Sequence, residues 1–343
     1  MYKDIMAKIT NKQELSEQEI FELIGDIKND NVTDVQIAGF QVALLMKGAS
    51  LREIASIAKA MRQNCVPIRP RVRDELMDTC GTGGGLSTFN ISTATALVAA
   101  AAGIPVAKHG SRSISSLSGS ADVLEALGIN INLTPAEAEE LIEKINIAFL
   151  YAPLFHPVMC KVLPPETELG IKTIFYTIIG PLINPAFAPR HLLGVYKPEL
   201  LDTVTYVAQE LGYTRAMFVY GEDGLDEISL IGPTMINDLH DGKVDKYEIK
   251  PEDFGLSRCT LDEIVTGTPQ DNAATITGVF DGSIAGPRRD AILLNAAGAL
   301  IIGGKAKDFP EGIALAASLI DSGKAKDKLC ELRDMSHSVA EGK

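Results

Sequence analysis

A glycine-rich segment at residues 80–93, CGTGGGLSTFNIST, has the composition of an anion-binding loop. Glycine loses more backbone entropy on folding than any other residue, so four glycines within five positions indicate a tight turn or backbone N–H groups close to a ligand. The segment LMDT at 76–79 predicts a short buried strand before the loop, and an alanine-rich stretch at 92–102 predicts a helix after it. A helix N-terminus directs free N–H groups and its positive dipole end at a phosphate. The alternative interpretation is a turn without a ligand.

The letters of this loop exclude two common phosphate-binding motifs. No G-K-[ST] follows the glycines, so the loop is not of the Walker A type. The glycine spacing also fails the G-x-G-x-x-G pattern of dinucleotide-binding folds.

A second polar cluster, KHGSRSISS at 108–116, follows a predicted strand at 104–109. It combines cations, hydroxyls and a glycine, a composition suited to wrapping a phosphorylated sugar, although a solvated turn would look similar. The next segment, 118–122, is expected to cap the following helix and to offer a second anion site.

A third cluster, GEDGLDE at 221–227, ends in the acidic pair Asp226 and Glu227. One or two carboxylates are what Mg²⁺ on a diphosphate requires, with waters and phosphate oxygens completing the octahedron. Apolar Ile228 and Leu230 follow directly, so we expect the pair beside a buried strand rather than in a solvated loop. The chain has no H-x-x-x-H spacing and no G-x-S-x-G elbow, which makes a covalent hydrolase a poor fit.

The elements that position these clusters fall into two regions. Capping boxes beginning at Ser16, Thr33 and Ser50 predict three amphipathic helices within the first 65 residues. A proline-containing linker, VPIRPRVR, follows, and from about residue 74 strand and helix patterns alternate. We therefore predict a small helical N-terminal domain at 1–66 and a large α/β domain at 67–343, with a mostly parallel central sheet. Ligands bind at the carboxyl ends of strands in such sheets, where the first two clusters fall.

Composition limits the class of protein. The net charge of −13 at pH 7 argues against nucleic acid as a partner. The longest apolar run, 94–107, is short for a membrane span and contains Gly103 and Pro105, so no membrane association is expected. The first residues lack the apolar core of a signal peptide, and the five cysteines form no C-x-x-C pair. Free thiols in a reducing cytoplasm fit this pattern best.

Several motifs together resemble the anthranilate phosphoribosyltransferases. They are GTGGG-LSTFNIST, KHGSRSISSLSGSADVLEALG, YAPLFHPVM, LGIKTIFYTIIGPLINPA, GLDEISLIGPT and PRRDAILLNAAGAL, in the family's order and over nearly the whole chain. The resemblance implies a nucleoside phosphorylase/phosphoribosyltransferase-like fold and a helical domain completed by a segment near 165–185. It also implies a homodimer that pairs through the helical domain. The implied activity moves ribose-5-phosphate from phosphoribosyl pyrophosphate (PRPP) to the amine of anthranilate with Mg²⁺, in tryptophan biosynthesis.

The resemblance assigns site residues position by position and requires no protein nucleophile. Those implied to bind PRPP are Gly81, Thr82, Gly83, Gly84, Gly85, Thr88, Asn90, Ile91, Ser92, Thr93, Lys108, Arg112, Ser113, Ser115, Ser116 and Ser120. Those implied to bind the acceptor are Gly81, His109, Ser111 and Glu166, and those implied to hold Mg²⁺ are Ser92, Asp226 and Glu227.

Four positions depart from the family pattern. Gly85 stands where the family has Asp, Ser111 where it has Asn, Leu117 where it has Lys, and Glu166 where it has the Arg that faces the anthranilate carboxylate. A hydrogen bond to a charged group is worth about 1.5–3 kcal/mol, so loss of that Arg predicts an affinity for anthranilate lower by about tenfold to a few hundredfold. Glu166 would suit a neutral amine, a phenol or a cationic acceptor better.

Three hypotheses follow. The first is a phosphoribosyltransferase acting on anthranilate or a related aromatic amine. The second is an enzyme of the same fold with a non-carboxylate acceptor or a phosphorolytic activity. The third is a non-catalytic binding protein, against which stand the retained segment Asn90–Thr93 and the acidic pair.

Overall fold

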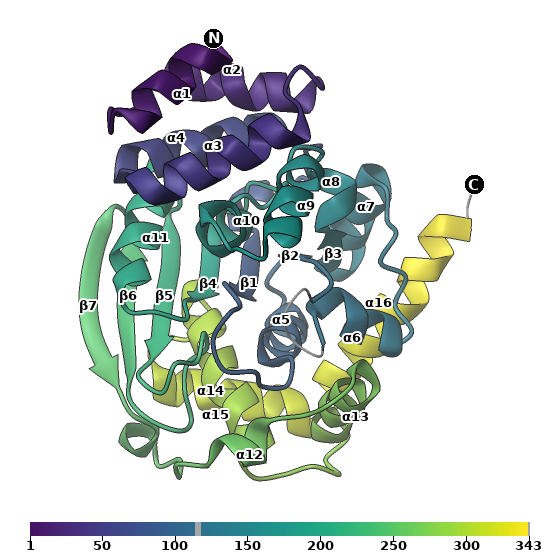
Figure 1. Cartoon of the computed structure of the whole chain (residues 1–343). Coiled ribbons are helices and arrows are strands. Elements are labelled where there is room, and N and C mark those ends of the chain that lie inside the picture. Colours follow the sequence, from purple (N-terminus) through teal and green to yellow (C-terminus); the bar gives the residue numbers. More distant parts are fainter. Residues whose placement is uncertain (114–117, 342–343) are drawn as a thin grey trace.

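A mixed seven-stranded sheet forms the centre of the large domain in this computed structural model, which describes residues 1–113 and 118–341 (Figure 1). The strand order is β3-β2-β1-β4-β5-β6-β7. Neighbours from β3 through β5 pair in parallel, and β6 and β7 pair antiparallel at one edge, so the predicted mostly parallel α/β sheet is confirmed. The strands are β1 (Met77–Gly81), β2 (Val106–Gly110), β3 (Ile147–Tyr151), β4 (Arg190–Gly194), β5 (Arg215–Gly221), β6 (Thr234–His240) and β7 (Lys243–Ile249).

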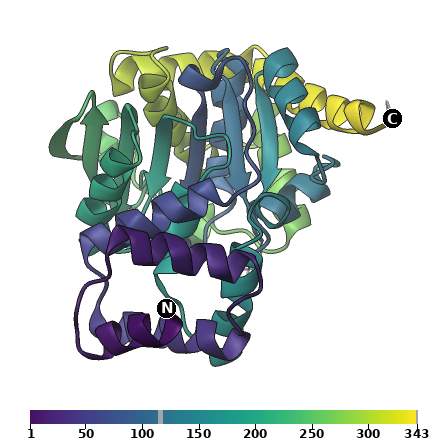
Figure 2. The same ribbon diagram turned by 90° about the horizontal axis from the view of Figure 1, so that it is seen from above.

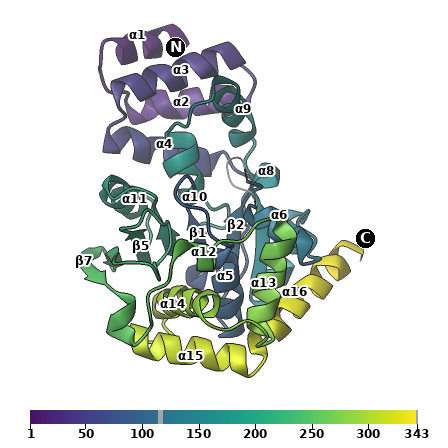
Figure 3. The ribbon, with the colours of Figure 1, turned by 60° about the horizontal axis from the view of Figure 1, so that its bottom comes forward.

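Helices cover both faces of this sheet (Figure 3). The parallel strands are short and almost wholly buried, as expected where both faces are packed. On one face the alanine-rich helix α5 (Ile91–Ala101) packs against α14 (Pro287–Ile302), and the other face carries α11 (Glu199–Glu210). The remaining elements of the large domain are η1 (Arg73–Glu75), α6 (Ser120–Ala126), α7 (Pro135–Ile145), α8 (Ala152–Phe155), η3 (Pro251–Phe254), α12 (Leu261–Ile264), α13 (Pro269–Phe280), α15 (Phe309–Asp321) and α16 (Lys324–Glu341).

The N-terminal helices form a separate layer, with the sheet between them and the C-terminal helices (Figure 2). All three predicted capping boxes are present, because the hydroxyls of Ser16, Thr33 and Ser50 each accept from the backbone N–H three residues on. These helices are α1 (Tyr2–Thr10), α2 (Glu17–Lys28), α3 (Asp34–Lys47) and α4 (Leu51–Gln63).

A second segment of the chain packs with this helical layer. It consists of α9 (Met159–Leu169), the π-helical turn η2 (Phe175–Ile179) and α10 (Gly180–Leu182). Val162, Phe175 and Ile179 share one buried core with residues of α1–α4. The chain thus returns to the helical layer at residues 159–182, which overlap the segment near 165–185 that the family resemblance implies.

The acidic pair lies beside buried strands, as expected, since Asp226 packs against Gly81 of β1 and Gly194 of β4. The buried residues Ile228 and Leu230 that follow are not themselves in a strand, because residues 222–233 form a turn-rich connection between β5 and β6. Apolar burial here anchors a loop, which periodicity over so few residues does not distinguish from a strand.

Among the described helices, none is both long and apolar enough to cross a membrane.

Candidate active site

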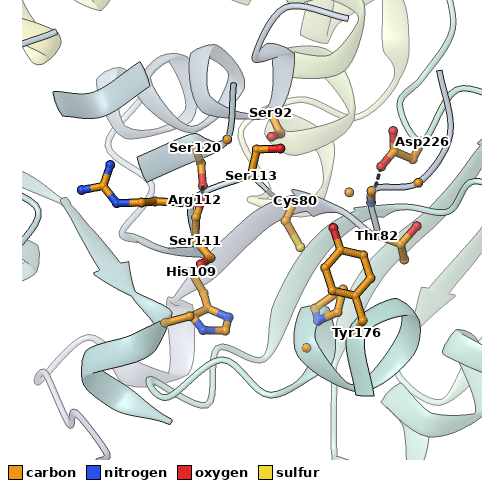
Figure 4. Close-up of a pocket in the computed structure, with 18 of the residues that line it drawn as sticks. Cys80, Thr82, Ser92, His109, Ser111, Arg112, Ser113, Ser120, Tyr176 and Asp226 are labelled. Carbon is orange, nitrogen blue, oxygen red and sulfur yellow. Dashed lines mark hydrogen bonds between the residues drawn. The ribbon is translucent and has the colours of Figure 1, made fainter. Parts of the chain in front are cut away.

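A cavity of about 1020 Å³ opens at the carboxyl ends of β1 and β2, where the sheet meets α9 and η2 (Figure 4). It brings together all three polar clusters that the sequence singled out. The predicted site residues that line it are Gly81, Thr82, Gly83, Gly84, Gly85, Thr88, Asn90, Ser92, Lys108, His109, Ser111, Arg112, Ser113, Ser120, Asp226 and Glu227.

The glycine loop owes its shape to residues without a side chain. Gly83 and Gly84 have φ values of +65° and +92°, a conformation that L-residues rarely adopt. The departure at Gly85 also has a structural counterpart, since a Cβ there would lie 2.4 Å from the Gly224 carbonyl oxygen. The loop in this conformation has no room for the Asp of the family pattern.

The N-terminus of α5 meets the loop at the cavity wall. The Asn90 N–H donates to the side-chain oxygen of Asn272 at 3.0 Å, and the Ser92 N–H donates to Glu227 Oε1 at 3.2 Å. Two neighbours that the family resemblance assigned to PRPP do not line the cavity: Ile91 packs in the core, and the Thr93 side chain is buried within the domain. A helix turns successive side chains by 100°, so only part of the segment faces the ligand side.

Lys108 is a buried cation at the end of β2. Its Nζ donates to the Thr79 carbonyl oxygen at 2.6 Å and to Ser92 Oγ at 3.4 Å. Burial lowers the pKa of Lys108, while the carboxylates of Asp78 and Glu227 oppose that shift. The ammonium is therefore held at the junction of the glycine loop and α5.

Asp226 and Glu227 bring two carboxyl groups to the same junction. Asp226 Oδ2 accepts from the Gly83 N–H at 2.7 Å, so the acidic loop and the glycine loop are joined directly. Burial raises the pKa of Asp226, and burial together with the neighbouring Asp226 raises the pKa of Glu227 to about 8. Two crowded carboxylates beside a phosphate loop are a donor set that fits Mg²⁺, which takes oxygen ligands.

The segment after β2 is fixed by acids of α6. Arg112 donates to Asp122 at 2.9 Å and to Glu125 at 2.8 Å, and Asp122 also accepts from the backbone N–H groups of Ser113 and Gly119. The guanidinium of Arg112 is thus paired with two acids of the adjacent helix. Ser115, Ser116 and Leu117 lie outside the described residues.

Glu166 contradicts the expectation that it faces the acceptor. Its side chain is 3% exposed and does not line the cavity. The carboxylate accepts from Gln41 Nε2 at 3.1 Å, from the Thr173 N–H at 3.3 Å and from the Thr173 hydroxyl. It lies between α9 and α3, where burial raises its pKa. The side chain packs inward because this face of α9 is covered by the N-terminal helices.

Several residues without a predicted role line the side of the cavity formed by α9 and η2. Lys172 and Tyr176 stand on the cavity wall, with the Lys172 ammonium 5.0 Å from the Tyr176 ring centroid. Apolar side chains of Met159 and Leu163 line the cavity beside them. The motif LGIKTIFYT contains Lys172 and Tyr176, but the sequence does not show which way they face. In the fold both line the cavity, whereas Thr173 of the same motif donates to Glu166.

Comparison with known proteins agrees with this architecture. A glycosyl transferase family helical bundle domain matches residues 3–65, and a glycosyl transferase family a/b domain matches residues 73–326. The anthranilate phosphoribosyltransferase of Acetivibrio thermocellus is 46% identical over 339 residues, which are 98% of this chain and 97% of that protein. The chain belongs to the anthranilate phosphoribosyltransferase family.

Other members of the anthranilate phosphoribosyltransferase family are similar over their whole length. The enzyme of Desulfosudis oleivorans is 45% identical over 98% of this chain and 99% of its own. The crystal structure of the Thermus thermophilus enzyme has a TM-score of 0.90 and 39% identity, covering 97% of this chain and 99% of its own. The Saccharomyces cerevisiae enzyme, in complex with PRPP and Mg, has a TM-score of 0.89 and 28% identity, covering 98% of each chain.

Proposed function

We propose that this protein transfers ribose-5-phosphate from PRPP to the amino nitrogen of anthranilate with Mg²⁺, releasing pyrophosphate, as a step of tryptophan biosynthesis. The observation that carries the proposal is the junction of three clusters at one cavity end, where Asp226 binds the Gly83 N–H and Glu227 binds the Ser92 N–H. Relatives named anthranilate phosphoribosyltransferase match 98% of the chain, and the structure of one relative was solved in complex with PRPP and Mg.

The donor is held mainly by backbone groups and one cation. The glycine loop and the N-terminus of α5 present N–H groups to the pyrophosphate, and Lys108 adds a buried positive charge. During transfer the bond from ribose C1 to the pyrophosphate oxygen breaks and a bond from C1 to the amine nitrogen forms. The proton released from the amine passes to solvent or to the departing pyrophosphate. Fixed positive groups stabilise the negative charge that develops on the leaving pyrophosphate. They lower the barrier without a protein nucleophile.

Asp226 and Glu227 would hold Mg²⁺, with Ser92 beside them. The metal supplies positive charge to the departing pyrophosphate. The chain's own contribution is to fix both carboxylates on backbone amides of the two phosphate-binding segments. Their placement before the metal binds limits the reorganisation that binding requires.

Lys172 is our candidate for the contact to the acceptor carboxylate. Position 166 no longer supplies an arginine, and its carboxylate is turned away from the cavity. Lys172 lies on the cavity wall beside Tyr176, six positions along the chain, and carries the opposite charge to the acceptor. This arrangement favours anthranilate over the non-carboxylate acceptors that the sequence left open.

The test is pyrophosphate release from PRPP with Mg²⁺ and either anthranilate or aniline. We expect turnover with anthranilate, and Asp226→Asn should lower kcat/KM on the order of 100-fold. Glu222→Gln is the matched control, because Glu222 is an exposed acid of the same loop outside the cavity lining. Release only with aniline would favour the changed-acceptor hypothesis. Tight PRPP binding without any turnover would favour the binding protein.

We also propose that two copies pair through the helical layer, as the family resemblance implies. The supporting observation is an apolar stripe on the outward side of α3, where Val35 is 82% exposed and Met46 is 79% exposed. Val42 lies between them on the same side of the helix, and Leu45 flanks it. Exposed apolar side chains in a row are typical of an interface.

We place the protein in the cytoplasm. All five cysteines are free thiols in the structure, which suits a reducing compartment. PRPP and anthranilate are both intermediates of biosynthetic metabolism, which is consistent with this location.

A further inference from the structure

Three side chains of the kind that bind transition metals lie together beneath the glycine loop. Asp78 and Cys80 stand two residues apart on β1, so they project from the same face of the sheet. His191 is paired in register with Asp78 on the adjacent strand β4, which places its ring on that face as well. The strand pairing therefore gathers a carboxylate, a thiol and an imidazole from two separate parts of the sequence.

The three groups are within reach of one cation. Cys80 Sγ lies 3.2 Å from His191 Nε2, that nitrogen lies 4.0 Å from Asp78 Oδ2, and all three atoms lie within 4.8 Å of one another. Bonds of about 2.3 Å to sulfur and about 2.0 Å to nitrogen in a tetrahedral site place those two atoms about 3.5 Å apart. The thiol and imidazole lie close to this spacing, and the carboxylate, 4.0 Å from the imidazole nitrogen, must move toward them to become the third ligand.

Neighbouring groups hold the carboxylate and the ring in place. Asp78 Oδ1 accepts from the N–H groups of Thr79 and His109, and Oδ2 accepts from Asn184 Nδ2 at 2.7 Å. The His191 ring stacks on Tyr213 with 5.8 Å between centroids. Such outer contacts orient metal ligands and strengthen binding. The Asp78 and His191 side chains are fully buried, whereas Cys80 is half-buried and lines the cavity.

We propose that Asp78, Cys80 and His191 form a binding site for a divalent cation of the zinc class, with a fourth coordination position open toward the cavity. A sulfur, nitrogen and oxygen set selects zinc-like ions, whereas Mg²⁺ prefers the all-oxygen pair Asp226 and Glu227. As the cation binds, the Cys80 S–H bond breaks, the sulfur–metal bond forms and the proton passes to solvent. No oxidant or reductant takes part.

The location gives this site a consequence for the cavity. Cys80 directly precedes Gly81, and the carbonyl of Thr79, the residue between the two β1 ligands, accepts from the Lys108 ammonium. A cation here lies beside the lysine that we assign to the donor phosphates, and like charges repel. The added positive charge should therefore change the affinity for PRPP without occupying the Mg²⁺ position.

Cobalt(II) tests the site directly, because thiolate ligation gives a charge-transfer band in the near ultraviolet that oxygen ligation does not. The full-length, reduced and chelator-treated protein is titrated with Co²⁺ in excess Mg²⁺, so that the carboxylate pair is occupied. We expect the band to saturate at one equivalent and to disappear on addition of Zn²⁺. His191→Gln should weaken Co²⁺ binding on the order of 100-fold, and Cys80→Ser should abolish the band.

Cys160→Ser is the matched control, since Cys160 also lines the cavity but is not part of this cluster. It should leave the band unchanged. A second measurement needs no substitution: Zn²⁺ should protect Cys80 from alkylation, read by mass spectrometry, and leave Cys160 reactive. No band in the wild-type protein, a band that survives Cys80→Ser, or equal alkylation of Cys80 with and without Zn²⁺ would overturn the proposal. These readouts do not depend on turnover, so they separate this site from the proposed activity.

Discussion

At the scale of single residues, Gly84 shows how backbone conformation serves the phosphate loop. Its φ of +92° is strained for any L-residue, while a Cβ there would meet Lys172 and Tyr196 only at ordinary contact distances of 3.6–3.8 Å. Gly84→Ala therefore acts through backbone strain of about 1–2 kcal/mol. We expect PRPP affinity to fall about 5–30-fold, measured by calorimetry with Mg²⁺. Gly48→Ala introduces a similar strain at φ +79° in the helical layer, and PRPP affinity should not change.

Lys172 carries the acceptor prediction at the same scale. Removing a charged partner of the carboxylate in Lys172→Met should raise KM for anthranilate by about 10–150-fold, since such a contact is worth about 1.5–3 kcal/mol. KM for aniline, which has no carboxylate, should stay the same, and Lys172→Arg should retain most of the affinity. Lys197→Met is the control, because Lys197 also lies over a tyrosine ring but outside the described cavity lining. Equal losses with anthranilate and aniline would contradict the assignment.

At the scale of elements, the contact between α9 and α3 contains a buried acid without a cationic partner among its described contacts. Burial raises the pKa of Glu166 above its unfolded value of about 4.3, so the folded state binds a proton more tightly than the unfolded state does. Stability conferred by that proton is lost as pH rises through the folded-state pKa. The neighbouring Gln41 Oε1 is buried with no hydrogen-bond partner, so it would accept from a neutral group at position 166.

Glu166→Gln should therefore stabilise the protein in a pH-dependent way. We expect a gain of about 1–3 kcal/mol at pH 8 in urea unfolding and a much smaller gain at pH 5, because the wild-type acid is then closer to neutral. Glu168→Gln, an exposed acid on the same helix, should show no such difference. The same gain at both pH values would mean that ionisation of Glu166 is not the cause.

At the scale of the whole molecule, the exposed stripe on α3 predicts the assembly. Met46→Lys places a charge among Val35, Val42 and Leu45, which costs little in a monomer but is unfavourable in an apolar interface. Sedimentation should show a dimer for the wild type and a monomer for the variant. At a dilution where both proteins are monomeric, the variant should have the same thermal unfolding midpoint as the wild type. Met235→Lys, at an exposed side chain of β6, should remain dimeric.

Much of the local structure followed from the sequence, because its causes lie within a few residues. Capping boxes at Ser16, Thr33 and Ser50 join a hydroxyl to an amide three positions away, so the letters alone predict where those helices begin. The glycine loop between β1 and α5 was predictable for the same reason, and the alternation of elements fixed the fold class.

Only the tertiary structure decided which side chains share the cavity. Gly83 and Asp226 are 143 positions apart, and Asp78 meets His191 because β1 and β4 are neighbours in the sheet, a pairing that no local pattern encodes. Glu166 was assigned to the acceptor by its position in a motif, yet packing of α3 on α9 turns it away and leaves Lys172 on the wall. Periodicity tells which residues are polar or apolar along an element, whereas the direction a polar side chain faces depends on what the rest of the chain packs against it.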